Sequence, residues 1–236
     1  MFIETIMSNT PDNKFVRDFT AFQKIISHYG MYNSISQTLL KITSPGVPDF
    51  YQGTELWNFS LVDPDNRRSV DYNLRINMLE ELKKREIEIT LPEFTRELTV
   101  NKENGKIKLY LIYKALNYRK NNRELFDRGE YLPLEVMGKK ADNVCAFVRR
   151  IGNNRILIIT PRFFTSLISQ PTELPLGETV WDDTFIIIPI AEPGAKYKNI
   201  FTGEMLTARE YRDATALHLS EVFSNFPVAM LERIYD

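Results

Sequence analysis

The sequence changes character near Gly129, and this change constrains the fold more than any other feature. Before it, apolar residues recur at steps of three and four, which is the period of a helix. After it come short runs bounded by turn residues, such as YLPLEV, NVCAFVRRI, NRILIITPR and TFIIIPI. Runs of that length and spacing are typical of an antiparallel β-sandwich. We therefore expect two domains, residues 1–128 and residues 129–236.

The first domain is predicted to be mainly helical. Asp12 is placed to cap a first helix and Gly30 to end it, and a second helix is expected over residues 33–42. Further helices are expected over residues 71–88 and 106–121. The inward face of the first helix is predicted from its spacing to hold Phe15, Phe19, Phe22, Ile26 and Tyr29.

Between the helices, the run VPDFYQG at residues 47–53 predicts one short buried strand. Residues 92–105 are mixed and polar, and residues 203–216 resemble a connection between strands. A lone parallel strand cannot satisfy its backbone hydrogen bonds without neighbours. The first domain is therefore predicted to be the end of a larger α/β fold.

Composition excludes several classes of function. The formal charge of −1 over 236 residues gives no global reason to expect nucleic acid or an anionic membrane as a partner. The single cysteine, Cys145, excludes an internal disulfide, and two scattered histidines lack the spacing of a zinc site, so neither metal nor cofactor is expected. No apolar run approaches the roughly 18 residues of a membrane-spanning helix. A cytoplasmic, reducing location is the resulting expectation.

The segment Pro45–Tyr72 concentrates proline, glycine, aromatic, acidic and arginine residues. Asp63 and Asp65 would lie about 6.6 Å apart on one face of an extended chain, and a carboxylate pair can hydrolyse glycosides. The arginines that follow, Arg67 and Arg68, favour instead a turn in which side chains bond the local backbone.

Trp57 precedes this turn and supplies a flat apolar face. Sugars bind where such a face lies next to fork-shaped hydrogen-bond donors and acceptors. A sugar-binding role and a purely structural role for Trp57 and for each arginine stay open at this point.

The stretch SQTLLKITSPGVPDFYQGTELWNFSLVDPDNRRSVDY closely resembles the region around the eighth barrel strand of maltooligosyl trehalose synthases, a family of the α-amylase clan. The pattern PGxPxxYxGxE is shared across the clan, whereas ELWNFSLVDPDNRR is more specific to this family. The runs YLPLEVMGKKADNVCAFVRR, ILIITPR and FPVAML resemble the tail of the same enzymes. The resemblance extends from Phe15 to Leu231 and corresponds to the C-terminal portion of the family.

The resemblance implies a fold and an activity. The fold is α/β plus all-β: the last βα units of a TIM-type (β/α)8 barrel, followed by an antiparallel C-terminal β-sandwich. The family isomerises the reducing-end α-1,4 linkage of a maltooligosaccharide to α-1,α-1, a step of trehalose biosynthesis. The clan mechanism is retaining and uses three carboxylates on earlier barrel strands. No segment here matches those strands, so no catalytic residue is assigned and the chain alone is expected to be inactive.

The resemblance also implies a substrate-binding rim at the mouth of the barrel. The residues expected there are Trp57, Asp63, Asp65, Asn66, Arg67 and Arg68. Maltooligosaccharide is the expected ligand, bound weakly or not at all by the isolated chain.

Two alternatives remain beside this interpretation. The chain could be a carbohydrate-binding or structural module without activity, or a fragment of another glucan hydrolase of the α-amylase clan. A barrel that lacks its first strands exposes an edge and an apolar inner face, so we also expect self-association through that edge.

Overall fold

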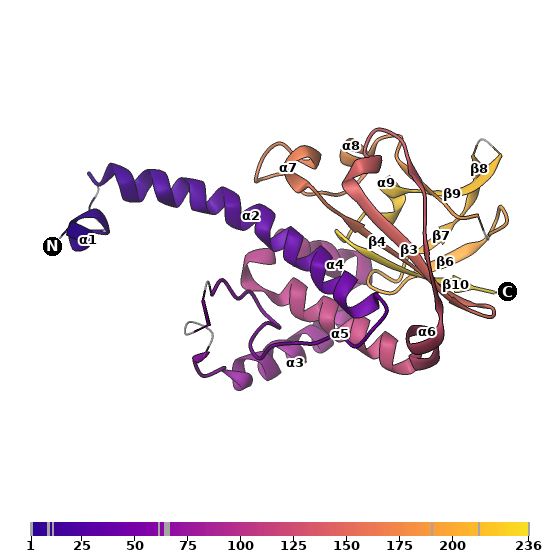
Figure 1. The fold of residues 1–236 in the computed structure, drawn as a ribbon, viewed down its shortest axis with the longest axis horizontal. Helices are drawn as coiled ribbons and strands as arrows, with labels where there is room; N and C mark the ends of the chain where they lie inside the picture. Colours follow the sequence, from indigo (N-terminus) through magenta and orange to yellow (C-terminus); the bar gives the residue numbers. More distant parts are fainter. Residues whose placement is uncertain are drawn as a thin grey trace.

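The computed structural model describes residues 2–8, 10, 12–60, 62–63, 67–189, 191–211 and 213–235. Long helices fill the first half of the chain, and strands with short helical turns fill the second (Figure 1). The helices are α1 (Phe2–Ile6), α2 (Lys14–Thr43), α3 (Tyr72–Glu88), α4 (Leu91–Val100), α5 (Lys106–Asn121), α6 (Arg123–Arg128), α7 (Phe164–Leu167), α8 (Glu178–Trp181) and α9 (Leu219–Val222), with 3-10 turns η2 (Lys102–Asn104) and η3 (Ala141–Asn143). The strands are β1 (Glu130–Pro133), β2 (Val136–Met137), β3 (Val144–Ile151), β4 (Asn154–Pro161), β5 (Phe185–Ile187), β6 (Lys196–Asn199), β7 (Met205–Thr207), β8 (Arg209–Tyr211), β9 (Ala214–His218) and β10 (Ala229–Ile234).

Helix α2 is one continuous helix of 30 residues, so the prediction of two helices is wrong. Its cap is Asn13, whose side chain accepts from the Val16 N–H at 3.2 Å, rather than Asp12. Gly30 lies inside the helix, and no neighbouring atom lies within 4 Å of where its Cβ would be. A mid-helix glycine costs only about 1 kcal/mol relative to alanine, which the flanking helix formers and the packing beyond it outweigh.

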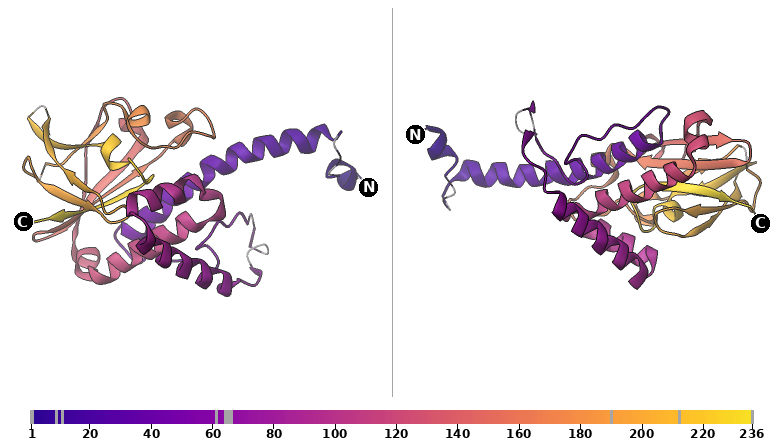
Figure 2. Two further views of the ribbon diagram at one scale, coloured as in Figure 1. Left: turned by 180° about the vertical axis from the view of Figure 1, so that it is seen from behind. Right: turned by 90° about the horizontal axis from the view of Figure 1, so that it is seen from below.

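The two halves of α2 differ in burial. Figures 1 and 2 show its N-terminal half, together with α1, pointing away from the rest of the molecule. The face predicted to be inward is mostly exposed, because Phe15, Phe19, Phe22 and Ile26 are 51–60% accessible. The C-terminal half packs on α5 and β4, and its fully buried apolar residues are Tyr32, Ile35, Leu39 and Ile42.

The predicted strand at residues 47–53 is wrong. This segment is irregular and turn-forming in the structure. Among the residues that the structure describes, none before β1 forms a strand, so the segment has no neighbour with which to build a ladder. The short apolar run therefore stays a loop between α2 and α3.

The other helical predictions are confirmed, with one addition. Helices α3 and α5 occupy the predicted ranges, and Asp71 caps α3 by accepting from the Leu74 N–H at 2.9 Å. The polar stretch at 92–105 contains helix α4, which begins at a capping box: the Glu93 carboxylate accepts from the Thr90 backbone N–H at 3.3 Å, and also from the Thr90 hydroxyl at 2.7 Å.

The second half of the chain forms two antiparallel sheets. One sheet has the order β1-β3-β4-β10-β6-β7 and the other the order β2-β5-β9-β8. The longest pairing is the β3–β4 hairpin, which runs from Val144 opposite Pro161 to Ile151 opposite Asn154. Its turn holds Gly152 at φ 55°, a conformation that favours glycine. The predicted connection at 203–216 contains β7 and β8, two edge strands of three residues each, which are too short to show a strand period in the sequence.

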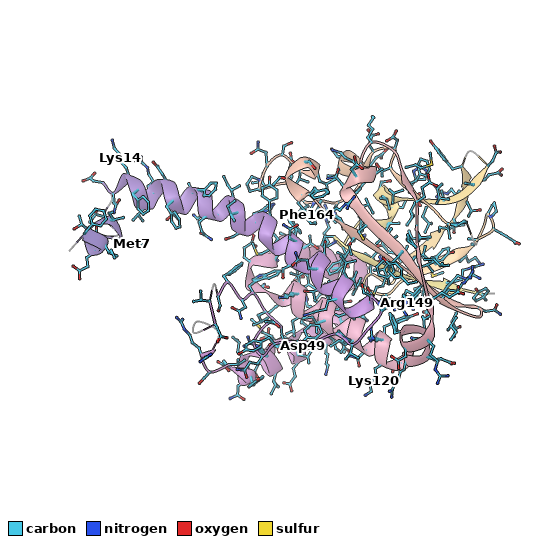
Figure 3. The ribbon with its side chains drawn as sticks, in the orientation of Figure 1. Met7, Lys14, Asp49, Lys120, Arg149 and Phe164 are labelled. Atoms are coloured by element: carbon cyan, nitrogen blue, oxygen red, sulfur yellow. The ribbon has the colours of Figure 1, made fainter. Side chains whose placement is uncertain are left out.

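The helical half and the strand half share one hydrophobic core. Arg149 on β3 is 1% exposed and donates to the carbonyls of Thr43, at 3.1 Å, and of Phe126, at 2.8 Å. Figure 3 places it where the end of α2 and α6 meet the large sheet. Tyr110 on α5 adds a second link by donating to the carbonyl of Phe201 at 2.7 Å. These contacts fix the loop between α2 and α3 relative to the sheets.

Candidate functional site

The segment Pro45–Tyr72 is anchored to the helices through Arg75 on α3. Its guanidinium donates to the Glu55 carboxylate at 2.9 Å, to the Gly53 carbonyl at 2.8 Å and to the Asp71 carbonyl at 3.0 Å. Three fixed points on one planar donor group give the loop a defined shape. Glu55 therefore serves as a structural acceptor in this arrangement.

Trp57 is half-buried against the helices rather than presented freely. Its indole N–H donates to the Lys102 carbonyl at 2.7 Å, and the Lys108 ammonium lies 5.7 Å from its ring centroid. Next to it, Leu56 packs on Gly105, where an added Cβ would meet Leu56 at 3.2 Å. The N–H of Trp57 is thus already used by the protein, and only its ring is available to a ligand.

The acidic and basic part of the loop is exposed. Asp63 and Arg67 form an ion pair and are each about two-thirds accessible, and Arg68 is exposed nearby. Asp65 and Asn66 lie outside the described residues. Of the predicted rim residues, the structure thus joins Asp63 to Arg67 and attaches Trp57 to the helical body.

A pocket of about 370 Å³ lies between α2, this loop and α5, and the sequence reasoning missed it. Its lining includes Gln37, Lys41, Asp49, Tyr51, Thr54 and Lys108. Figure 3 labels Asp49, which lies on the loop beside the helices. The one sequence signal was a lysine within the apolar run Ile107–Ile112, where a charge on a helix face otherwise buried needs an explanation.

Burial governs the charges of this pocket. Lys108 is 8% exposed, and its desolvation, followed by the nearby charge of Lys41, lowers its pKa to about 8. The negative charge of Glu55 raises the pKa of Lys108 and so opposes part of this shift. Desolvation also lowers the pKa of Lys41, and the negative charge of Asp49 opposes this shift. The Lys41 ammonium lies 3.8 Å from the centroid of the Phe50 ring, at a distance that allows a cation–π contact.

Two other kinds of site are absent from the described part of the chain. It holds no group of three or more His, Cys, Asp or Glu side chains that could bind a metal ion. None of its helices is both long enough and apolar enough to cross a membrane.

No family model matches the chain. Its fold is of the kind found in α-amylases: it superposes on an Anoxybacillus α-amylase with a TM-score of 0.51 at 14% identity, over 87% of this chain and 33% of that one. At that identity the likeness concerns the fold alone.

The similarity to one enzyme family is closer. The chain is 31% identical over 222 residues to a protein of Mycobacterium tuberculosis (strain CDC 1551) that carries the name maltooligosyl trehalose synthase. It also superposes on the maltooligosyltrehalose synthase of Arthrobacter ramosus with a TM-score of 0.72 at 25% identity. In sequence and in fold, it is therefore similar to the C-terminal portion of maltooligosyl trehalose synthases.

This chain spans about a quarter of the length of these relatives. The matches cover 94% of the chain and 23% of the M. tuberculosis protein, and 98% of the chain and 26% of the A. ramosus enzyme.

Proposed function

We propose that the chain forms the C-terminal portion of an enzyme that isomerises the reducing-end α-1,4 linkage of maltooligosaccharides to α-1,α-1. The observation that carries this proposal is similarity to maltooligosyl trehalose synthases over nearly the whole chain, in sequence and in fold. In this proposal residues 1–128 complete a TIM-type barrel and residues 129–236 form the C-terminal β-sandwich. A cytoplasmic location stays a prediction from the sequence.

In this proposal the chain lines one side of the substrate-binding site, and this side is called the wall below. Asp63, Arg67 and Arg68 are exposed and can reach sugar hydroxyls, while the anchoring of the loop by Arg75 limits the entropy lost on binding. The ring of Trp57 would contribute an apolar surface, since its N–H is already bonded. Asp65 and Asn66 complete the proposed rim.

We further propose that the chain alone does not catalyse the reaction. A retaining transglycosylation needs a nucleophilic carboxylate and a general acid/base placed on either side of the glycosidic bond. In the proposal these groups come from the part of the relatives that this chain does not span. The wall then orients the sugar, and the missing carboxylates carry out the bond exchange.

The experiment is a paired assay with maltopentaose. The isolated chain should leave the number of reducing ends unchanged. A chimaera, in which the chain replaces the matching segment of the M. tuberculosis relative, should remove reducing ends without releasing glucose. Arg67→Ala and Arg68→Ala in the chimaera should lower activity, whereas Arg123→Ala, at an exposed ion pair with Asp127 on α6, should not. Loss of reducing ends by the isolated chain would overturn the claim of inactivity, and release of glucose or maltose as the main product would favour a glucan hydrolase.

Self-association through the barrel edge stays a prediction from the sequence, and we propose in addition that the exposed half of α2 is a contact surface between copies of the chain. Its phenylalanines recur on one face, and Phe15 stacks on Phe19 with 5.8 Å between ring centroids. Apolar side chains arranged in such a stripe usually mark a contact surface. Light scattering at micromolar concentration should give a mass above that of one chain, and the double variant Phe19→Glu, Phe22→Glu should give the mass of one chain. A single-chain mass for the unmodified protein would contradict this proposal.

A further inference from the structure

Lys108 is a buried cation without a carboxylate partner in the described part of the chain. Only 8% of it is exposed, and its ammonium makes one long hydrogen bond, to the Leu56 carbonyl at 3.4 Å. The nearby Glu55 is already paired with Arg75. Because a buried charge is costly unless it is paired, this ammonium is a strong candidate for contact with an anion from solution.

Lys41 lines the same pocket from α2 and also forms no ion pair with any described residue. It contacts the face of the Phe50 ring, and its positive charge disfavours the charged form of Lys108. Asp49, which is exposed, is the one acidic side chain of the lining, and its negative charge favours the charged form of Lys41. Two lysines that repel each other across a pocket with one exposed carboxylate leave it with a net positive charge, which an anion would neutralise.

The rest of the lining is neutral and polar. The Gln37 amide has no hydrogen-bond partner among the described residues, and the Thr54 hydroxyl, which donates to the Tyr51 carbonyl at 2.7 Å, keeps its oxygen as an acceptor. The volume of about 370 Å³ exceeds what a bare phosphate needs. The pocket therefore has room for a hydroxylated group attached to an anion.

We propose that this pocket binds a small phosphate-type oxyanion, with the ammonium groups of Lys108 and Lys41 on the anion and Gln37 beside the group that it carries. The lining does not include Asp63 or Arg67, although the Lys108 ammonium lies 5.7 Å from the ring centroid of Trp57, and the proposal does not depend on the proposed isomerase function. Binding would replace the repulsion between the two lysines by two charge-assisted contacts.

The test is calorimetric titration of the chain with inorganic phosphate at pH 7 and constant ionic strength. Saturable binding is expected for the unmodified chain, and Lys41→Met and Lys108→Met should each weaken it by about tenfold or more. The same replacement of Lys24 on α2 and of Lys106 on α5, which lie outside this lining, should change it by less than about twofold. Absence of binding by the unmodified chain, or binding by both pocket variants that is as tight as that of the unmodified chain, would overturn the proposal.

Two further measurements complete the test. Glucose 6-phosphate and glucose decide the source of the anion: tighter binding of the ester than of phosphate identifies a sugar phosphate, and equal binding identifies the free anion. Binding of glucose as tight as that of its phosphate ester would contradict the proposal.

Should a variant fail to fold, the melting temperature of the unmodified chain decides, because phosphate must raise it more than an equal ionic strength of sodium chloride.

Discussion

The two halves of helix α2 share one backbone and one apolar period, yet only one of them is covered. Leu39 in the C-terminal half is 0% exposed, and Phe19 in the N-terminal half is 54% exposed. The difference lies in the neighbours, because α5 and β4 lie against the first and no described element lies against the second. A helical period therefore tells which residues share a face, and tertiary structure decides whether that face is buried.

The largest effect should come from matched truncations in the two halves. Leu39→Ala should lower the free energy of unfolding by about 2–5 kcal/mol, since it removes packed atoms and leaves a cavity. At protein concentrations where the chain is a single copy, Phe19→Ala should change it by no more than about 0.5 kcal/mol, because a side chain that is exposed in the single chain loses little. Urea unfolding followed by circular dichroism measures both. Equal losses would show that the N-terminal half is covered in solution, and concentration dependence would then trace the cover to a second copy.

The C-terminal end of α2 is linked to the large sheet by Arg149, and a substitution there tests how much this link contributes to stability. Arg149→Met should cost about 2 kcal/mol, because each buried carbonyl left without a donor costs about 1–3 kcal/mol, while removal of a buried cation offsets part of this loss. Arg150→Met, on the same strand but in a partly exposed pair with Glu130, is the control and should cost at most about 1 kcal/mol. If the two variants had the same stability, Arg149 would not be the link between α2 and the sheet.

Stability should also depend on pH through Lys108, which lies beside the covered half. Its folded pKa of about 8 lies below its ordinary value of 10.5, so the unfolded chain binds more protons between these values. The cost of burial is fully present below pH 8 and is relieved as pH rises, so this group makes the protein more stable towards pH 10.5. Urea midpoints measured from pH 7 to pH 10 should show a rise that Lys108→Met removes. A rise that persists in this variant would assign it to another group.

The smallest effect is expected where the two halves join. Gly30→Ala should stabilise the protein by about 0.5–1 kcal/mol, because alanine favours the helix and nothing lies within 4 Å of the new Cβ. Thermal unfolding would detect this as a small rise in melting temperature. A loss of stability would mean that the chain bends or ends its helix at Gly30 in solution.

Local signals in the sequence anticipated much of the fold and part of the candidate site. The boundaries of α3 and α5 and the runs that form β3, β4 and β5 follow from period and capping, which depend on near neighbours in the chain. The motif around Gly53 and Glu55 lies in the loop that lines one side of the pocket of Lys41 and Lys108. The pocket of Lys41 and Lys108 was not predicted, because its members come from three segments that only folding brings together.

The sequence by itself determined which residues prefer helix, strand or turn, and it carried the resemblance to a family of glucan-converting enzymes. Tertiary structure alone decided that Gly30 continues a helix, that residues 47–53 form no strand, and that half of α2 is left uncovered. The physical reason is common to the three. Each outcome depends on whether segments distant in the sequence supply packing or hydrogen-bond partners. Where such partners are present, they outweigh local propensities, which amount to about 1 kcal/mol per residue.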